Sequence, residues 1–109
     1  MTFKNGEVVR LKNRIAIVTG GAGGIGEAIA LMFAQHGAGV IVADLNYEGA
    51  IETATDINDK GGLAHAIKVD VTKIDSVQNL IDESIKTFKQ LDILVNVAGV
   101  GGFGHFIDV

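Results

Sequence analysis

Residues 15–26 read IAIVTGGAGGIG, and this stretch is the strongest indication of the fold in the sequence. It begins with a β-branched run of the kind found in buried parallel strands. It continues into a glycine-rich turn and ends where a helical pattern begins. Glycine allows a tight turn and keeps side chains away from a phosphate, whose oxygens the free N–H groups at a helix start can bind. The stretch therefore predicts a strand, a phosphate-binding loop and a helix in direct succession.

The glycines fit two registers of a dinucleotide-binding loop. Gly21, Gly23 and Gly26 match G-x-G-x-x-G, whereas Gly20, Gly24 and Gly26 match G-x-x-x-G-x-G. Either match alone is a weak signal, because a flexible turn has the same composition. The position between a strand and a helix strengthens the dinucleotide interpretation.

Strand-like and helix-like segments alternate along the rest of the chain. Apolar runs lie at residues 15–18, 40–43, 63–69 and 93–95. The residues that recur at helical spacing between these runs are Ile25, Ile29, Met32 and Phe33, then Ala50, Ile51, Ala54 and Ile57, then Ile74, Val77, Ile81, Ile85 and Phe88. Thr72-x-x-Asp75 resembles a capping box at the start of the third helix. This order predicts the α/β class, with a Rossmann-like doubly wound parallel sheet reduced to βαβαβαβ.

Right-handed crossovers restrict the topology of this sheet. They place the first two helices on one face and the third helix on the other, which gives the strand order 3-2-1-4. The switch point then lies between the first and fourth strands, where ligands bind at the carboxyl ends. Residues 93–95 are expected to form an unpaired edge, which would make the chain prone to association and only marginally stable.

The composition of the chain argues against several classes of function. The chain has 109 residues, 48% of them apolar, enough for one compact domain over residues 1–109. A net charge of -4 without a basic run argues against nucleic-acid binding. The absence of cysteine excludes disulfides and thiol chemistry, and the three histidines are too scattered for a metal site. Without an apolar stretch of signal-peptide or membrane-span length, we expect a cytoplasmic protein that does not bind membranes.

Asp44 is the candidate partner of the glycine loop, because it closes the second apolar run 18 residues after Gly26. A carboxylate at this place can accept hydrogen bonds from the adenosine ribose hydroxyls. The alternative role for an isolated Asp is a solvated loop carboxylate or a helix cap. Asp44 is followed by Leu45, and the loop contains no Arg or Lys, so the pattern favours NAD over NADP.

Four motifs, namely the glycine loop, Asp44, Asp70-Val71 and residues 96–99, occur in an order that resembles the amino-terminal, cofactor-binding half of a short-chain dehydrogenase/reductase. Thr19-Gly20-x-x-x-Gly24-x-Gly26 resembles the cofactor loop of that family and decides between the two registers. Asp70-Val71 resembles its adenine-contacting pair, and Asn96-Val97-Ala98-Gly99 resembles its Asn-Asn-Ala-Gly element, with Val97 replacing the second Asn. The cofactor-binding residues that the resemblance implies are Gly20, Gly23, Gly24, Ile25, Gly26, Asp44, Leu45, Asp70, Val71, Asn96, Ala98 and Gly99.

The resemblance implies an NAD-dependent oxidoreductase that transfers hydride between nicotinamide and an alcohol or ketone, as a homo-oligomer at full length. The family's catalytic Ser and Tyr-x-x-x-Lys lie beyond the matched region. The single tyrosine, Tyr47, is followed four places on by Ile51, and Ser76 and Ser84 fall within the third helical pattern. No catalytic residue carries over, so the 109-residue chain alone is expected to be inactive.

One other function fits the same residues, and two further classes of protein fit them poorly. A non-catalytic fragment or remnant that binds a dinucleotide fits the same residues. A nucleotide-hydrolysing P-loop is rejected, because Glu27 and Ala28 replace the required Lys and Ser or Thr after the last glycine. A phospho-receiver domain would need clustered acidic residues after the first strand, where this chain has glycines.

Overall fold

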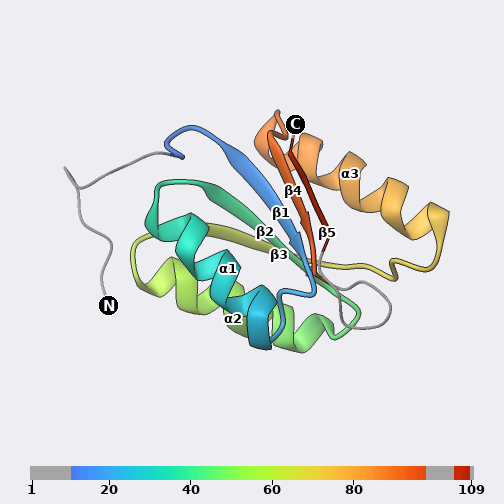
Figure 1. The fold of residues 1–109 in the computed structure, drawn as a ribbon, viewed down its shortest axis with the longest axis horizontal. Helices are drawn as coiled ribbons and strands as arrows, with labels where there is room; N and C mark the ends of the chain where they lie inside the picture. The colour runs from blue at the N-terminus through green and yellow to red at the C-terminus, as the bar shows by residue number, and fades with distance from the viewer. Residues whose placement is uncertain (1–10, 98–104, 109) are drawn as a thin grey trace.

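Four parallel strands form the centre of the structure, in the order that the sequence predicts (Figure 1). The computed structural model describes residues 11–97 and 105–108. The strands are β1 (Ile15–Thr19), β2 (Gly39–Asp44), β3 (Leu63–Lys68), β4 (Ile93–Asn96) and β5 (His105–Asp108), and the helices are α1 (Gly24–Gln35), α2 (Tyr47–Asp59) and α3 (Ile74–Phe88). The sheet order is β3-β2-β1-β4-β5, with the first four strands parallel. The α/β class and the 3-2-1-4 arrangement are thus confirmed.

The two faces of the sheet carry separate apolar clusters. Val18, Val40 and Val42 are fully buried on the face covered by α1 and α2. Ile17 and Ile41 are equally buried on the opposite face, under α3. Successive side chains of a strand point to opposite faces, so a sheet covered on both sides needs continuous apolar strands. Figure 1 shows this layering, with α1 and α2 below the sheet and α3 alone on the other side.

The expectation that residues 93–95 form an unpaired edge is wrong. β5 pairs antiparallel with β4 along its whole length, from Ile93 opposite Asp108 to Asn96 opposite His105. The backbone groups of β5 thus satisfy the free side of β4. The argument for association through a β4 edge therefore no longer holds.

The buried face of α1 also differs from the predicted apolar stripe. Ile25 and Met32 are 70% and 53% exposed, and the innermost residues are Gly26, Ala30 and Ala34. Small residues let the helix axis approach the sheet closely, so the larger apolar side chains are displaced to the flanks. A pattern search for large apolar residues does not detect such a face.

The contact face of α3 is rotated relative to the prediction. Ile74 and Ile85 are exposed, while Leu80 and Ser84 are buried. Ser84 interrupts the apolar pattern, yet its hydroxyl donates to the Leu80 carbonyl oxygen at 2.7 Å and is satisfied within the helix. The predicted capping box is wrong too, because the helix begins after Lys73 without a side-chain cap.

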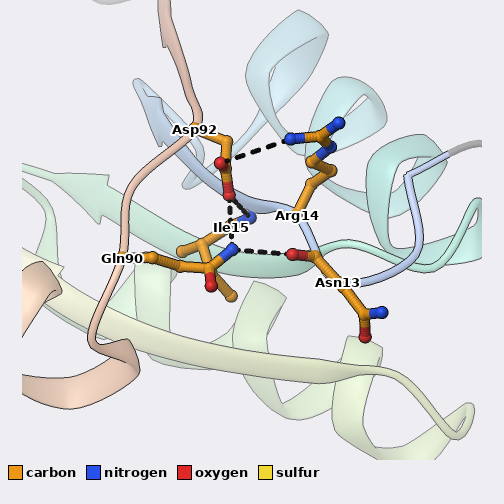
Figure 2. A network of polar contacts seen from close by, with 5 residues as sticks. All are labelled: Asn13, Arg14, Ile15, Gln90 and Asp92. Carbon is orange, nitrogen blue, oxygen red and sulfur yellow. Dashed lines mark hydrogen bonds and ion pairs between the residues drawn. The ribbon is translucent and has the colours of Figure 1, made fainter.

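A polar network ties the start of β1 to the segment that enters β4 (Figure 2). One oxygen of the Asp92 carboxylate accepts the Ile15 N–H at 2.8 Å and the Gln90 side-chain amide at 2.6 Å. Its other oxygen lies 3.6 Å from the Arg14 guanidinium. The Ile15 and Gln90 hydrogen bonds, followed by Arg14, hold the pKa of Asp92 below its ordinary value. The ionised carboxylate therefore stabilises the pairing of β1 with β4.

We expect Asp92→Asn to lower the melting temperature at pH 7 and the difference from wild type to shrink in acid. The depressed pKa means that the stabilisation is complete above about pH 4 and is lost as the pH falls through the folded-state pKa. Thermal melts between pH 7 and pH 2 measure this difference, with the exposed Asp59→Asn as control. A difference that stays constant over this range would contradict the role of the charge.

Candidate functional site

The residues expected to form the site follow the carboxyl ends of β1 to β4, which meet at one edge of the sheet (Figure 1). The residues that the structure brings to this edge are Gly20, Gly23, Gly24, Ile25, Gly26, Asp44, Leu45, Asp70, Val71 and Asn96. Ala98 and Gly99, expected to extend the site beyond β4, lie outside the described residues.

The glycine loop is held against the end of β2 by backbone hydrogen bonds. The N–H groups of Gly20 and Gly21 both donate to the Ala43 carbonyl oxygen, at 2.8 and 3.2 Å. Gly20 and Gly24 have φ angles of +77° and +60°, which favour glycine over other residues. These two positive-φ positions belong to the G-x-x-x-G-x-G register.

Gly26 and Gly21 are required by packing. A Cβ at Gly26 would clash with the carbonyl group of Gly20, so only glycine lets α1 start this close to the turn. A Cβ at Gly21 would lie 2.7 Å from Cγ1 of Val42. Gly21 is outside the register that the family resemblance selects, although its packing on β2 fixes the path of the loop.

Gly23 is the open position of the loop. It is the N-cap of α1, its φ of -176° is ordinary extended backbone, and a Cβ there would meet no atom within 4 Å. No side chain caps the helix start. Within the described part of the chain, the N–H groups of the first turn, which a helix cannot satisfy by itself, are therefore available to an anion at this edge.

Asp44 connects the glycine loop to the start of α2. Its Oδ2 accepts the Ala22 N–H at 3.0 Å, and its Oδ1 accepts the Asn46 N–H at 2.9 Å. The carboxylate is half-buried, and the neighbouring Leu45 is exposed. Each carboxylate oxygen can accept a further hydrogen bond, so these contacts leave room for hydroxyl donors.

Thr19 and Asn96 join the ends of β1 and β4. The buried Thr19 hydroxyl donates to Oδ1 of Asn96 at 2.7 Å. In addition, the Val97 N–H donates to the Thr19 carbonyl oxygen at 3.1 Å. These bonds fix the Asn96 side chain at the switch point of the sheet.

Asp70 lies beyond β3 and organises the turn that leads to α3. Its Oδ1 accepts the Thr72 hydroxyl at 2.6 Å and the Thr72 N–H at 3.0 Å, while its own N–H donates to the Ser76 hydroxyl. The Thr72 side-chain bond is the largest cause of a lowered pKa of Asp70. Val71 is half-buried against the apolar cluster under α3.

Ala22 and Gly49 form a contact that the sequence analysis missed. A Cβ at Gly49, in the first turn of α2, would lie 2.8 Å from the Cβ of Ala22. Glycine inside a helix costs stability relative to alanine, so its presence there was a usable signal of a close approach. The contact packs α2 directly against the glycine loop.

Membrane spans and metal-binding clusters are both absent from the described residues. No helix among them is both long and apolar enough to cross a membrane. Within the same part of the chain, no three His, Asp or Glu side chains gather in a way that could hold a metal ion.

Comparison with known proteins identifies the family. The family model of the short chain dehydrogenases matches residues 14–109. Since this match covers most of the chain, the protein belongs to the short-chain dehydrogenase/reductase family.

Individual relatives are enzymes of greater length. The chain is 41% identical over 98 residues to 7alpha-hydroxysteroid dehydrogenase of Escherichia coli, covering 90% of this chain and 38% of that enzyme. It is 48% identical over 95 residues to the uncharacterized oxidoreductase YuxG of Bacillus subtilis, covering 85% of this chain and 14% of the relative. The chain thus spans well under half the length of these relatives.

Solved structures agree with the fold. A crystal structure of hydroxysteroid dehydrogenase from Escherichia coli superposes with a TM-score of 0.83 at 41% identity, over 90% of this chain and 42% of that one. A 7 alpha-hydroxysteroid dehydrogenase complexed with NADH and 7-oxo glycochenodeoxycholic acid superposes with a TM-score of 0.78 at 37% identity, over 84% and 36%. That relative is complexed with NADH, and the part of it that superposes has the same fold as this chain.

We expect Gly26→Ala to destabilise the protein and Gly23→Asn to leave its stability unchanged or slightly raised. The alanine Cβ forces the loop or α1 to shift, which costs about 1–3 kcal/mol of unfolding free energy. In Gly23→Asn the new Cβ meets no neighbouring atom, and an asparagine side chain can cap a helix start that is otherwise uncapped. Denaturant unfolding of both variants measures the difference, and equal stabilities would show that the close approach at Gly26 is not a constraint.

Proposed function

We propose that this chain is the NAD-binding part of a short-chain dehydrogenase/reductase that transfers hydride between nicotinamide and an alcohol or ketone. The observation that carries the proposal is the 3.0 Å hydrogen bond from the Ala22 N–H to the Asp44 carboxylate. It joins the loop suited to phosphate with the carboxylate suited to ribose. In an adenine dinucleotide, the adenosine ribose carries both its free hydroxyls and the pyrophosphate. A ligand of this kind would therefore reach the loop and the Asp44 carboxylate together.

Each part of the edge suits one part of NAD. The pyrophosphate would bind the N–H groups between Gly20 and Gly26, aided by the positive end of the α1 dipole. The adenosine ribose hydroxyls would donate to Asp44, with Leu45 alongside. The adenine would lie near Asp70 and Val71.

The far side of the switch point suits the nicotinamide half of the cofactor. Asn96, held by Thr19, together with Ala98 and Gly99 beyond β4, would line that side. When bound, the nicotinamide supplies the hydride donor or acceptor. What the chain itself contributes is the binding and orientation of the dinucleotide.

Proton transfer to the substrate needs groups that this chain does not supply. The Ser84 hydroxyl is buried and donates to the Leu80 carbonyl, and the Ser76 hydroxyl accepts the Asp70 N–H. Both serines belong to α3, and their hydroxyls are engaged in structural hydrogen bonds. The single tyrosine, Tyr47, has Ile51 in place of the lysine of a Tyr-x-x-x-Lys pair. The alternative function, dinucleotide binding without catalysis, rests on this feature.

The chemistry of the substrate follows from the relatives alone. The solved relative holds NADH with 7-oxo glycochenodeoxycholic acid, a ketone. We extend to this protein only the general class, an alcohol or ketone.

We expect the protein to bind NAD more tightly than NADP, by roughly 30-fold at low salt. A carboxylate about 4 Å from the extra phosphate of NADP costs about 4 kcal/mol at an effective dielectric constant near 20, and solvent screening halves that cost. Calorimetric titration of the chain with both cofactors measures the ratio. Equal or tighter binding of NADP would refute the assignment of Asp44.

The matched control is Asp44→Asn, which removes the charge and keeps one of the two side-chain oxygens that accept the Ala22 and Asn46 N–H groups. We expect this variant to retain the fold by circular dichroism and to lose most of its preference between the two cofactors. An unchanged preference in Asp44→Asn would show that the discrimination comes from elsewhere. Failure of the wild-type chain to bind NAD at all would refute the proposed function itself.

A further inference from the structure

β3 is the outermost strand on its side of the described sheet. Val69, the residue directly after β3, donates its N–H to the Asp44 carbonyl oxygen of β2 at 3.1 Å. The odd-numbered residues of β3 therefore direct their backbone groups toward β2 in the same way. Backbone direction alternates along a strand. The N–H and C=O groups of Ala64, Ala66 and Lys68 therefore point away from the sheet. Such a row of backbone groups can pair with a strand of another molecule.

The first of these three positions is occupied by the side chain of Asn58, in the last turn of α2. The Asn58 amide donates to the Ala64 carbonyl oxygen at 3.1 Å, and its Oδ1 accepts the Ala64 N–H at 2.8 Å. A carboxamide carries the same donor and acceptor as a peptide group. Asn58 thus makes both bonds that a neighbouring strand would make at this residue.

The surface beside this edge is suited to apolar contact. A hollow of about 220 Å³ lies between α2 and β3, lined in part by Tyr47, Ile51 and Ala66. Tyr47 and Ile51 are each more than 40% exposed. Backbone pairing at β3 would therefore bring exposed apolar side chains into an interface.

We propose that Asn58 is an edge guard, which prevents β3 from pairing with β3 of a second copy of this chain. A second copy is the matching partner, because two identical edges can pair antiparallel about a two-fold axis. Pairing centred on Ala66 would place Ala64 of one copy opposite Lys68 of the other. Asn58 blocks such a pair at both ends, and only two outward-facing residues per copy remain available.

Asn58→Ala tests the proposal by freeing the backbone groups of Ala64. Four added backbone hydrogen bonds, two at each end of the pair, strengthen association by at least about one power of ten. We expect the variant to self-associate at a concentration at least about tenfold below that of wild type. Sedimentation velocity over a concentration series measures the change, with circular dichroism to verify the fold.

The matched control is the double variant Asn58→Ala with Ala66→Pro. Proline removes the outward N–H at the centre of the edge and does not disturb the bonds to β2. We expect the double variant to return to the behaviour of wild type, and Ala66→Pro alone to match wild type. Association that persists in the double variant, or no increase in association of Asn58→Ala, would overturn the proposal.

Amide hydrogen exchange of the wild-type chain provides a second test, which holds even if Asn58→Ala fails to fold. If Asn58 covers the edge in solution, the Ala64 N–H exchanges at least about tenfold more slowly than the Ala66 N–H, because only the former is bonded to Asn58. Equal exchange rates at the two positions would show that the edge is open in solution, which would overturn the proposal.

Discussion

The rest of the candidate site depends on the close approach of α1 to the turn that follows β1. A side chain at Gly26 would overlap the carbonyl group of Gly20, so this approach exists only because residue 26 is glycine. It sets the start of α1 directly at the carboxyl edge of the sheet. The small residues Ala30 and Ala34 continue the close contact along the helix. The free N–H groups of the first turn are thereby presented at the switch point.

Polar contacts then hold the neighbouring elements in register with this turn. The Ala22 N–H bond to Asp44 connects the loop to the end of β2, and the Thr19 hydroxyl connects β1 to Asn96 of β4. At the opposite edge, Asp92 binds the first residue of β1, Ile15. Side-chain hydrogen bonds therefore join β1 to β4, or to the segment that enters β4, at both ends of β1. The contacts of Thr19 and Ala22 restrict the path of the glycine loop, whose residues would otherwise have large backbone freedom.

Sequence reasoning predicted the strand order and most of the loop because both follow from strong local patterns. It predicted the buried face of α2, where Ala50, Ala54 and Ile57 are buried as expected. It failed on the faces of α1 and α3, since the innermost residues of α1 are glycine and alanine and those of α3 include Ser84. It also missed β5, because a short strand after a glycine-rich stretch carries little periodic signal. The Asp44 contact with Ala22 was not predictable either, as it depends on how the loop packs on α2 through Gly49. Propensity identifies elements, whereas such contacts depend on the assembled core.

If the start of α1 binds the pyrophosphate of NAD, as we propose, then a negative charge at residue 23 weakens the binding of NAD. Gly23→Asp and Gly23→Asn both supply an N-cap, and in neither does the new Cβ meet a neighbouring atom, so both variants should keep the fold. Only the Asp variant sets a negative charge against the phosphates. Calorimetric titration with NAD should show binding weakened by about tenfold or more in Gly23→Asp relative to Gly23→Asn. Equal affinities of the two folded variants would show that the pyrophosphate does not bind at the start of α1.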